Sequence, residues 1–251
     1  MITRHMRIAG WCWAGILLLG LGSPVWGQAT VRGQVLLVSN ARGHKKKENG
    51  SVVLWLTPKA GPVPKAELLR EFKSAQPLRL VQRNKAFHPH ILIVPTGAVV
   101  EFPNRDPFFH NVFSLFEGKR FDLGLYEAGT TRGVHFDRPG VSYIFCNIHA
   151  QMSAVVIALS TPYYAISQPS GEFNIPNVPA GTYELQVWYE GSTPDVLKAL
   201  RRRVTIPASG VTLAAIQVLE NTSLVPHKNK YGQNYDPGTY DPLYQQQQNE
   251  R

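Results

Sequence analysis

The chain has 251 residues, a formal net charge of +9, two cysteines and three methionines. Its basic residues cluster at positions 45–47 and 201–203, which we interpret as two solvated loops; docking to an acidic partner or to anionic lipid is the alternative. No nucleic-acid-binding motif accompanies this charge, so we expect no nucleic acid partner. The sequence also lacks the G-x-S-x-G, Walker and H-E-x-x-H motifs of common enzyme classes.

The first 27 residues have the pattern of a secretory signal peptide. Arg4 and Arg7 form a positive start, residues 14–22 are apolar, and small residues at 23–27 offer a cleavage point. The apolar stretch is shorter than the roughly 20 residues that a membrane-spanning helix needs. We therefore expect a periplasmic protein with no transmembrane span after cleavage; an uncleaved anchor is the alternative.

Loss of this leader leaves a mature chain with one cysteine and one methionine. Cys12, Met1 and Met6 lie in the leader, so Cys146 and Met152 remain, six positions apart. A disulfide within the mature chain is then excluded. A single cysteine in an oxidising compartment needs a reason to stay unpaired, and metal ligation would supply one.

The apolar residues of the mature chain mostly recur every second position, with frequent Gly and Pro between the runs. This pattern predicts an all-β fold of sandwiches or barrels. Short helices are expected within 64–73 and around 192–200, and the aliphatic-poor tail, 221–251, is expected to be disordered. The predicted strands are 31–38, 51–57, 90–94, 98–102, 111–116, 141–146, 154–159, 172–175, 182–189, 202–206 and 212–219.

The strands after residue 160 resemble the carboxypeptidase regulatory-like (transthyretin-like) β-sandwich. In residues 170–185 a Ser-Gly turn, a short strand and a Pro-Ala-Gly turn lead into a further strand. That family opens with a strand, a Gly turn and a second strand, which 31–38 and 51–57 resemble. We therefore expect a discontinuous sandwich of residues 30–58 plus 160–220, a helical linker at 59–77 and an inserted domain at 78–159. Two sequential domains are the alternative to this insertion.

The segment 139–152 carries the most informative motif. A predicted strand ends at Cys146, and His149 and Met152 follow in a C-x₂-H-x₂-M spacing. A trigonal His₂Cys site with a weak axial Met is the donor set of blue copper, because thiolate and thioether favour Cu(I) and imidazole accepts both oxidation states. The second imidazole has to come from another strand, and His110 fits that position.

The run F-x-P…V-x-x-G-x-x-V-x-F-x-N-x-D-x-x-x-H-N-V across residues 87–112, together with this loop, resembles small cupredoxins of the plastocyanin and amicyanin type. The resemblance implies a Greek-key cupredoxin domain at 78–159 that binds one type 1 copper, cycling between Cu(I) and Cu(II). It also implies that the backbone N–H of Asn111 hydrogen-bonds the thiolate. The implied copper ligands are His110, Cys146, His149 and Met152.

Two positions depart from the family pattern. Ala150 stands where many cupredoxins have Pro, and Ser153 where Gly is common, which bears on the Met–copper distance. A metal-free sandwich with ordinary Cys, His and Met residues is the alternative interpretation. The combination of both modules resembles proteins labelled methylamine utilization proteins, but nothing in the sequence supports methylamine as a substrate.

His88 and His90 form an H-x-H pair, which we interpret as strand-entry residues; a second copper-loading site is the alternative. Multicopper oxidases need several such pairs, and a dinuclear purple centre needs two cysteines. The sequence thus predicts an electron carrier, not an enzyme, with a periplasmic redox partner and possible glycan or envelope contact through the regulatory-like module. The alternatives are a copper-holding or delivery protein, and an envelope- or carbohydrate-binding module with a vestigial metal site.

Overall fold

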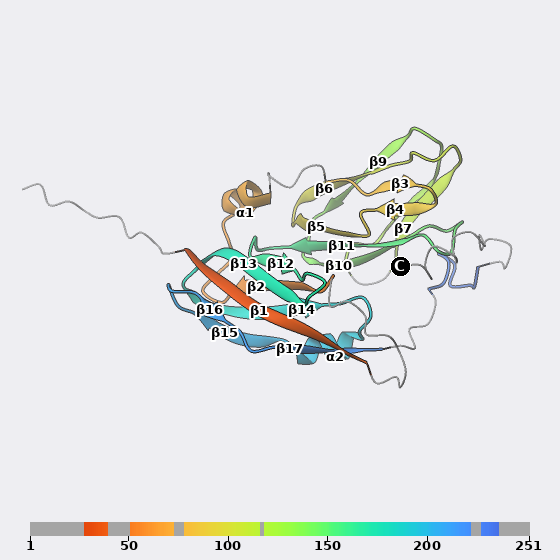
Figure 1. Ribbon diagram of the computed structural model, residues 1–251. Helices are drawn as coiled ribbons and strands as arrows, with labels where there is room; N and C mark the ends of the chain where they lie inside the picture. Colours follow the sequence, from red (N-terminus) through yellow and green to blue (C-terminus); the bar gives the residue numbers. More distant parts are fainter. Residues whose placement is uncertain (1–27, 40–50, 73–77, 116–117, 222–226, 236–251) are drawn as a thin grey trace, which may run out of the picture.

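The computed structural model describes residues 28–39, 51–72, 78–115, 118–221 and 227–235. The expected leader, the basic run at 45–47 and the tail beyond 235 lie outside these residues. The described chain is all-β, as predicted, with two short helices and two stacked β units (Figure 1). Within it, no helix has the length and apolar character needed to cross a membrane.

The first unit, here called the terminal sandwich, combines strands from both ends of the chain. One sheet places β1 between β13 and the strands β16 and β17; the other has the order β12-β2-β14-β15. Strands that precede residue 59 therefore pair with strands that follow residue 160 in both sheets. The division of the chain into independently folding domains stays a prediction. The strands are β1 (Gln28–Ser39), β2 (Val53–Pro58), β12 (Tyr164–Ile166), β13 (Glu172–Pro179), β14 (Gly181–Trp188), β15 (Arg202–Ile206), β16 (Val211–Thr212) and β17 (Ile216–Glu220).

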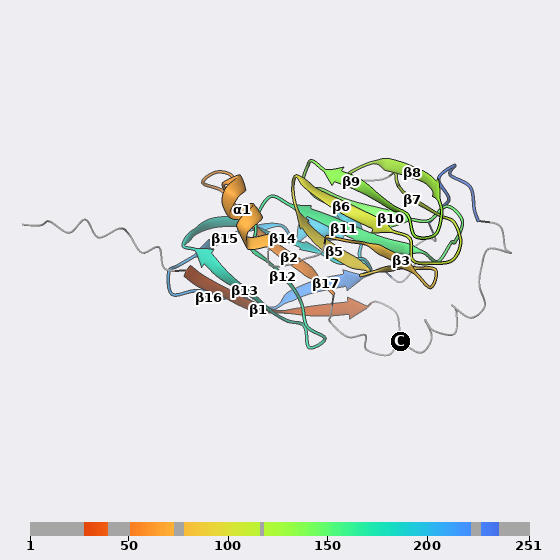
Figure 2. The same cartoon turned by 90° about the horizontal axis from the view of Figure 1, so that it is seen from above.

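The second unit, here called the middle unit, lies between these segments in the sequence. Its main sheet has the order β5-β11-β10-β7-β8, and β6 pairs with β9 in a second layer beside the β3-β4 hairpin (Figure 2). The strands are β3 (Val81–Arg83), β4 (Ala86–His88), β5 (Ile91–Pro95), β6 (Ala98–Pro103), β7 (His110–Ser114), β8 (Phe121–Tyr126), β9 (Thr131–Phe136), β10 (Gly140–Phe145) and β11 (Ser153–Leu159).

Strand β11 is buried on both faces, and it joins the two units. Successive side chains of a strand point to opposite faces of the sheet. Val155 and Ile157 accordingly pack into the core of the terminal sandwich, whereas Val156 and Ala158 pack into the core of the middle unit. The main sheet of the middle unit is therefore a wall shared by both hydrophobic cores.

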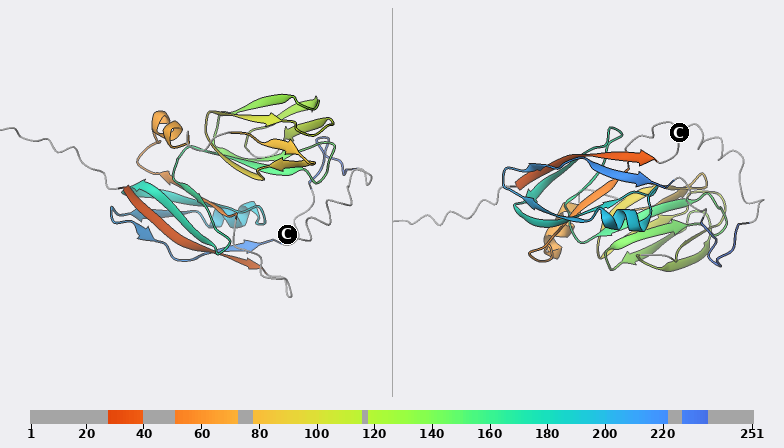
Figure 3. Two further views of the ribbon diagram at one scale, coloured as in Figure 1. Left: turned by 45° about the horizontal axis from the view of Figure 1, so that its top comes forward. Right: turned by 90° about the horizontal axis from the view of Figure 1, so that it is seen from below.

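Both helices lie where the sequence predicts them. The first, α1 (Lys65–Phe72), buries Leu68 and Phe72 against the terminal sandwich, and the ring of Phe72 stacks on Tyr164 with centroids 5.4 Å apart. The second, α2 (Pro194–Ala199), begins after Thr193, whose side chain accepts a hydrogen bond from an N–H of the first turn. This helix lies along the junction of the two units (Figure 3).

A polar contact also links the units at His90. Its Nε2 lies 2.6 Å from a carboxylate oxygen of Glu190, and its Nδ1 lies 3.1 Å from the carbonyl oxygen of Ser153. The hydrogen bond with Glu190 raises the pKa of His90 above its usual value, although burial opposes it. Both ring nitrogens therefore serve contacts within the chain, which agrees with the structural interpretation of this histidine.

The shared wall can be tested with a matched pair of substitutions. Val155→Ala and Val156→Ala remove the same groups from opposite faces of β11, where both valines are fully buried. Each is expected to lower the free energy of unfolding by about 1–3 kcal/mol, measured by chemical denaturation. Val99→Ala, at a position 55% exposed, is the control and should change it by less than about 0.5 kcal/mol. A near-zero effect of Val155→Ala would contradict burial of the outer face.

Candidate metal centre

The loop 146–152 connects β10 to β11 and is closed by its own backbone. The N–H of Cys146 donates to the carbonyl oxygen of Met152 at 3.2 Å, and the N–H of Met152 donates to that of His149 at 3.0 Å. Directly below, Phe145 and Ser153 are paired across the two strands. The C-x₂-H-x₂-M spacing is therefore held at the end of a hairpin whose strands fix its position.

His110 reaches this loop from β7, the neighbour of β10 in the main sheet. It is the first residue of that strand, and its side chain is fully buried. The Sγ atom of Cys146, also fully buried, lies 3.8 Å from Nδ1 of His110 and 3.7 Å from Nδ1 of His149. The three donor atoms all lie within 4.8 Å of one another.

These separations fit a trigonal metal site. In such a site, a first-row metal ion lies about 2.3 Å from a thiolate sulfur and about 2.0 Å from an imidazole nitrogen. With an angle of about 120° between these bonds, the sulfur and the nitrogen are about 3.7 Å apart. Both observed sulfur–nitrogen distances agree with this value. The three donor atoms therefore converge on one point.

Met152, the fourth predicted ligand, is fully buried in the same hydrophobic cluster as Cys146. Met152 stays at the base of the loop because it directly precedes β11 and because its carbonyl oxygen accepts the hydrogen bond from Cys146. The structure thus brings His110, Cys146 and His149 together as a donor cluster and places Met152 in the core beside Cys146.

Opposing effects act on the thiol of Cys146. Burial raises its pKa, because a charge is poorly solvated in the core, whereas backbone N–H groups of Asn111, Ile148 and His149 hydrogen-bond the sulfur and lower it. Burial dominates, so the metal-free thiol holds its proton more tightly than usual. A metal cation at this point would displace the proton, and the three N–H groups would stabilise the thiolate.

A buried carboxylate orients His110 from behind. Asp106 accepts a hydrogen bond from His110 Nε2 at 2.8 Å, and the N–H groups of Asn84 and Lys85 donate to it at 2.6 and 2.9 Å. Burial alone raises the pKa of Asp106, but these hydrogen bonds bring it below its usual value. Burial lowers the pKa of His110 and so favours the neutral imidazole. Because Nε2 carries the proton that Asp106 accepts, the neutral ring turns its Nδ1 lone pair toward the sulfur.

His149 is the accessible member of the cluster. Its ring is half-buried and lies 4.9 Å, centroid to centroid, from the ring of His110. The ring of Phe108 contacts both imidazoles, with its centroid 5.1 Å from that of His110 and 5.7 Å from that of His149. This aromatic contact limits water access to the donor atoms on that side while leaving part of His149 at the surface.

The described part of the tail differs from the sequence prediction. Residues 227–235, which fall in the segment expected to be disordered, pack on the ligand loop, at the right of Figure 1. The Tyr235 hydroxyl is buried and donates to the carbonyl oxygen of Cys146 at 2.8 Å. The backbone N–H of Lys230 donates to Asn147 at 2.9 Å, and its ammonium pairs with Asp122 at 2.8 Å.

Aromatic contacts explain how so polar a segment is held in place. The ring of His227 stacks on Phe145, the residue before Cys146, with centroids 4.0 Å apart, and meets Tyr235 edge to face at 5.3 Å. A prediction based on aliphatic content overlooks such contacts. The His and Tyr residues within the polar tail were the only available signal for this segment, here called the strap.

The comparisons with known proteins add a set of weak structural likenesses. No family model and no curated protein matches the chain. Among solved structures it is similar to a purple cupredoxin from Nitrosopumilus maritimus, with 22% identity, a TM-score of 0.30, and 32% of this chain and 98% of that one covered. It is also similar to a copper-containing nitrite reductase from Thermus scotoductus, at 19% identity and a TM-score of 0.33, covering 50% and 28% of the two chains.

A third similar structure is a mutant of amicyanin in its reduced Cu(I) form, with 17% identity and a TM-score of 0.32. The similarity covers 42% of this chain and 98% of that one. These neighbours are cupredoxins or contain copper, as their names state. Because their TM-scores lie near 0.3, the proposed function depends on the geometry of the donor cluster.

The strap can be tested at its buried hydroxyl. Tyr235→Phe leaves the carbonyl of Cys146 without its donor and is expected to lower the free energy of unfolding by about 1–2 kcal/mol, measured by chemical denaturation. Tyr231→Phe is the matched control, because Tyr231 is 70% exposed, and should have almost no effect. Equal effects of the two substitutions would argue against a strap on the loop.

Proposed function

We propose that this chain is an exported type 1 copper protein that carries electrons in the periplasm through one mononuclear centre. The observation that supports this most is the buried Sγ of Cys146 within 3.8 Å of two imidazole Nδ1 atoms. The proposed ligands are His110, Cys146 and His149, with Met152 as the weak axial donor.

The donor chemistry favours copper over other first-row metals. A soft thiolate with a thioether suits Cu(I), imidazole suits both oxidation states of copper, and a trigonal His₂Cys arrangement is the geometry of electron-transfer sites. When bound, copper supplies a one-electron couple. The chain's own contribution is a rigid cage, and a rigid cage keeps the reorganisation between the two oxidation states small.

Each contact around the cluster has a part in this role. Asp106 holds His110 in the tautomer whose Nδ1 is unprotonated and can ligate a metal ion. The three backbone N–H groups position the sulfur. Phe108 and the strap cover the loop against water. The half-buried ring of His149 leaves a surface at which a periplasmic redox partner can approach, so we propose an electron carrier and not an enzyme.

A copper-holding or delivery protein is the competing proposal, with a second loading site at His88 and His90. The contacts of both His90 nitrogens with Glu190 and Ser153 disfavour it. A carbohydrate- or envelope-binding module with a vestigial metal site is the third possibility. It is separated from the other two by whether copper binds at all.

Copper loading gives the first test of this proposal. One equivalent of Cu(II) added to the metal-free protein is expected to produce an intense visible charge-transfer band, because a buried thiolate ligates the ion. Cys146→Ser should abolish the band while preserving the circular dichroism spectrum, and the control His88→Ala should leave the band unchanged. A colourless wild-type protein would refute the type 1 assignment.

Met152 is expected to tune the potential of the centre. Met152→Leu removes a weak donor that stabilises Cu(II), and should raise the midpoint potential measured by redox titration; Met152→Gln supplies a harder oxygen and should lower it. If neither substitution moves the midpoint, Met152 is not an axial ligand, and the Ser153 departure from the family pattern becomes the first explanation to examine.

A further inference from the structure

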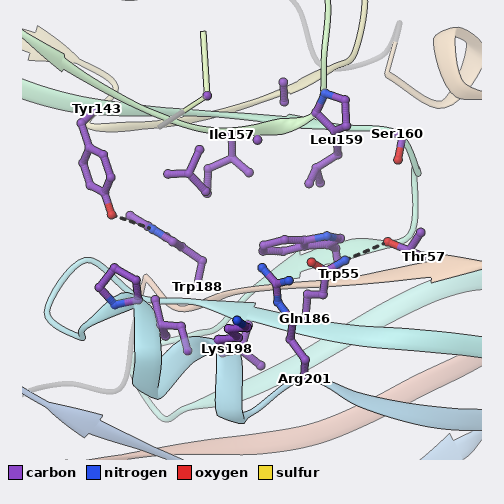
Figure 4. A pocket seen from close by; sticks show the side chains of 18 residues that line it. Trp55, Thr57, Tyr143, Ile157, Leu159, Ser160, Gln186, Trp188, Lys198 and Arg201 are labelled. Atoms are coloured by element: carbon purple, nitrogen blue, oxygen red, sulfur yellow. Dashed lines mark hydrogen bonds between the residues drawn. The ribbon is translucent and has the colours of Figure 1, made fainter. Parts of the chain in front are cut away.

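A cavity of about 450 Å³ lies between the two units, away from the donor cluster. It opens between the outer face of β10 and β11 on one side and β2, β14 and α2 on the other (Figure 4). Ligand cavities commonly have this size and occur where two structural units meet. Neither the proposed copper site nor the strap uses any residue of this cavity.

The walls of the cavity are mixed: Thr57 and Gln186, joined by a hydrogen bond of 3.0 Å, form a polar part. The apolar part includes two indole rings. Ile157 and Leu159 extend from β11 toward Trp55 and Trp188, which come from the opposing strands (Figure 4). The Trp188 indole N–H donates to the hydroxyl of Tyr143 at 3.3 Å, which fixes that ring across the junction. A flat ring could lie between the aliphatic and aromatic walls, because indoles favour stacking on planar groups.

Among the described residues that line the cavity, the charged side chains are all positive. Lys198 and Arg201, from α2 and the residues after it, are exposed at its edge, and none of the described residues that line it is Asp or Glu. Neither cation forms a salt bridge with a residue that the structure describes. The nearby Glu184, which does not line the cavity, forms a salt bridge with Lys59 at 2.8 Å, and the more distant charge of Arg201 also helps to lower the pKa of this carboxyl group.

We propose that this cavity binds a small planar organic anion, an aromatic carboxylate being the simplest member of the class. Its ring would occupy the space between the Trp55 face and Ile157, and its carboxylate would reach the edge of the cavity at Arg201 and Lys198. The guanidinium group suits this role because it pairs with a carboxylate through two parallel N–H···O bonds. This inference stands independently of copper binding.

Isothermal titration calorimetry of the full chain with 2-naphthoate tests the proposal, with neutral 2-naphthamide as the uncharged counterpart. We expect one molecule of 2-naphthoate to bind, and the amide to bind at least about tenfold more weakly. Arg201→Ala should weaken naphthoate binding by about tenfold and leave amide binding unchanged. Arg202→Ala is the matched control, because Arg202 is exposed on β15 and does not line the cavity.

The outcomes separate the ligand classes. No heat of binding at millimolar naphthoate would overturn the proposal. Equal losses of naphthoate affinity in Arg201→Ala and Arg202→Ala would also overturn it, because they would indicate attraction to the general surface charge. Amide and carboxylate binding equally well would overturn the anionic class. A Trp55→Leu variant that keeps its circular dichroism spectrum but loses naphthoate binding would support the stacked position of the ring.

Discussion

The burial of β11 on both of its faces is the constraint on which the other features of this structure depend. A strand in this position cannot slide in register without moving apolar side chains from one core into the other. Its antiparallel partner β10 is held through the same ladder, from Gly140 with Ala158 to Phe145 with Ser153. The ligand loop spans the end of that ladder, so the packing of two hydrophobic cores fixes where Cys146 and His149 stand.

Polar contacts then complete what the packing begins. A thiol in the core is costly to ionise, and three N–H groups directed at its sulfur partly offset that cost before any metal arrives. Asp106 accepts hydrogen bonds from the β3–β4 turn, and its own hydrogen bond with Nε2 orients the ring of His110. The strap adds a donor for the carbonyl of Cys146. Asn111 of β7, Asp106 with the β3–β4 turn, and the strap thus all converge on one loop, which accounts for a donor set already in place.

The sequence predicted the all-β class, most strands and the residues of the donor cluster, because alternating apolar residues and ligand spacing are local signals. It missed the three-residue strands β3, β4 and β12, which are too short to show an alternating pattern. It also missed β8 and β9, since Gly124 interrupts one and most side chains of the other are exposed. It also missed the strap, whose aromatic contacts depend on residues far away in the sequence. The cavity could not be predicted, because its walls come from strands that meet only when the two units pack together.

In the proposed function, one copper ion is bound by His110, Cys146 and His149. X-ray absorption at the copper edge, on protein loaded with one equivalent, measures that first coordination shell directly. One short copper–sulfur distance and two nitrogen neighbours are expected, with the sulfur neighbour absent in the Cys146→Ser variant. A shell of nitrogen and oxygen neighbours alone in the wild-type protein would contradict it, because copper would then be bound elsewhere on the chain.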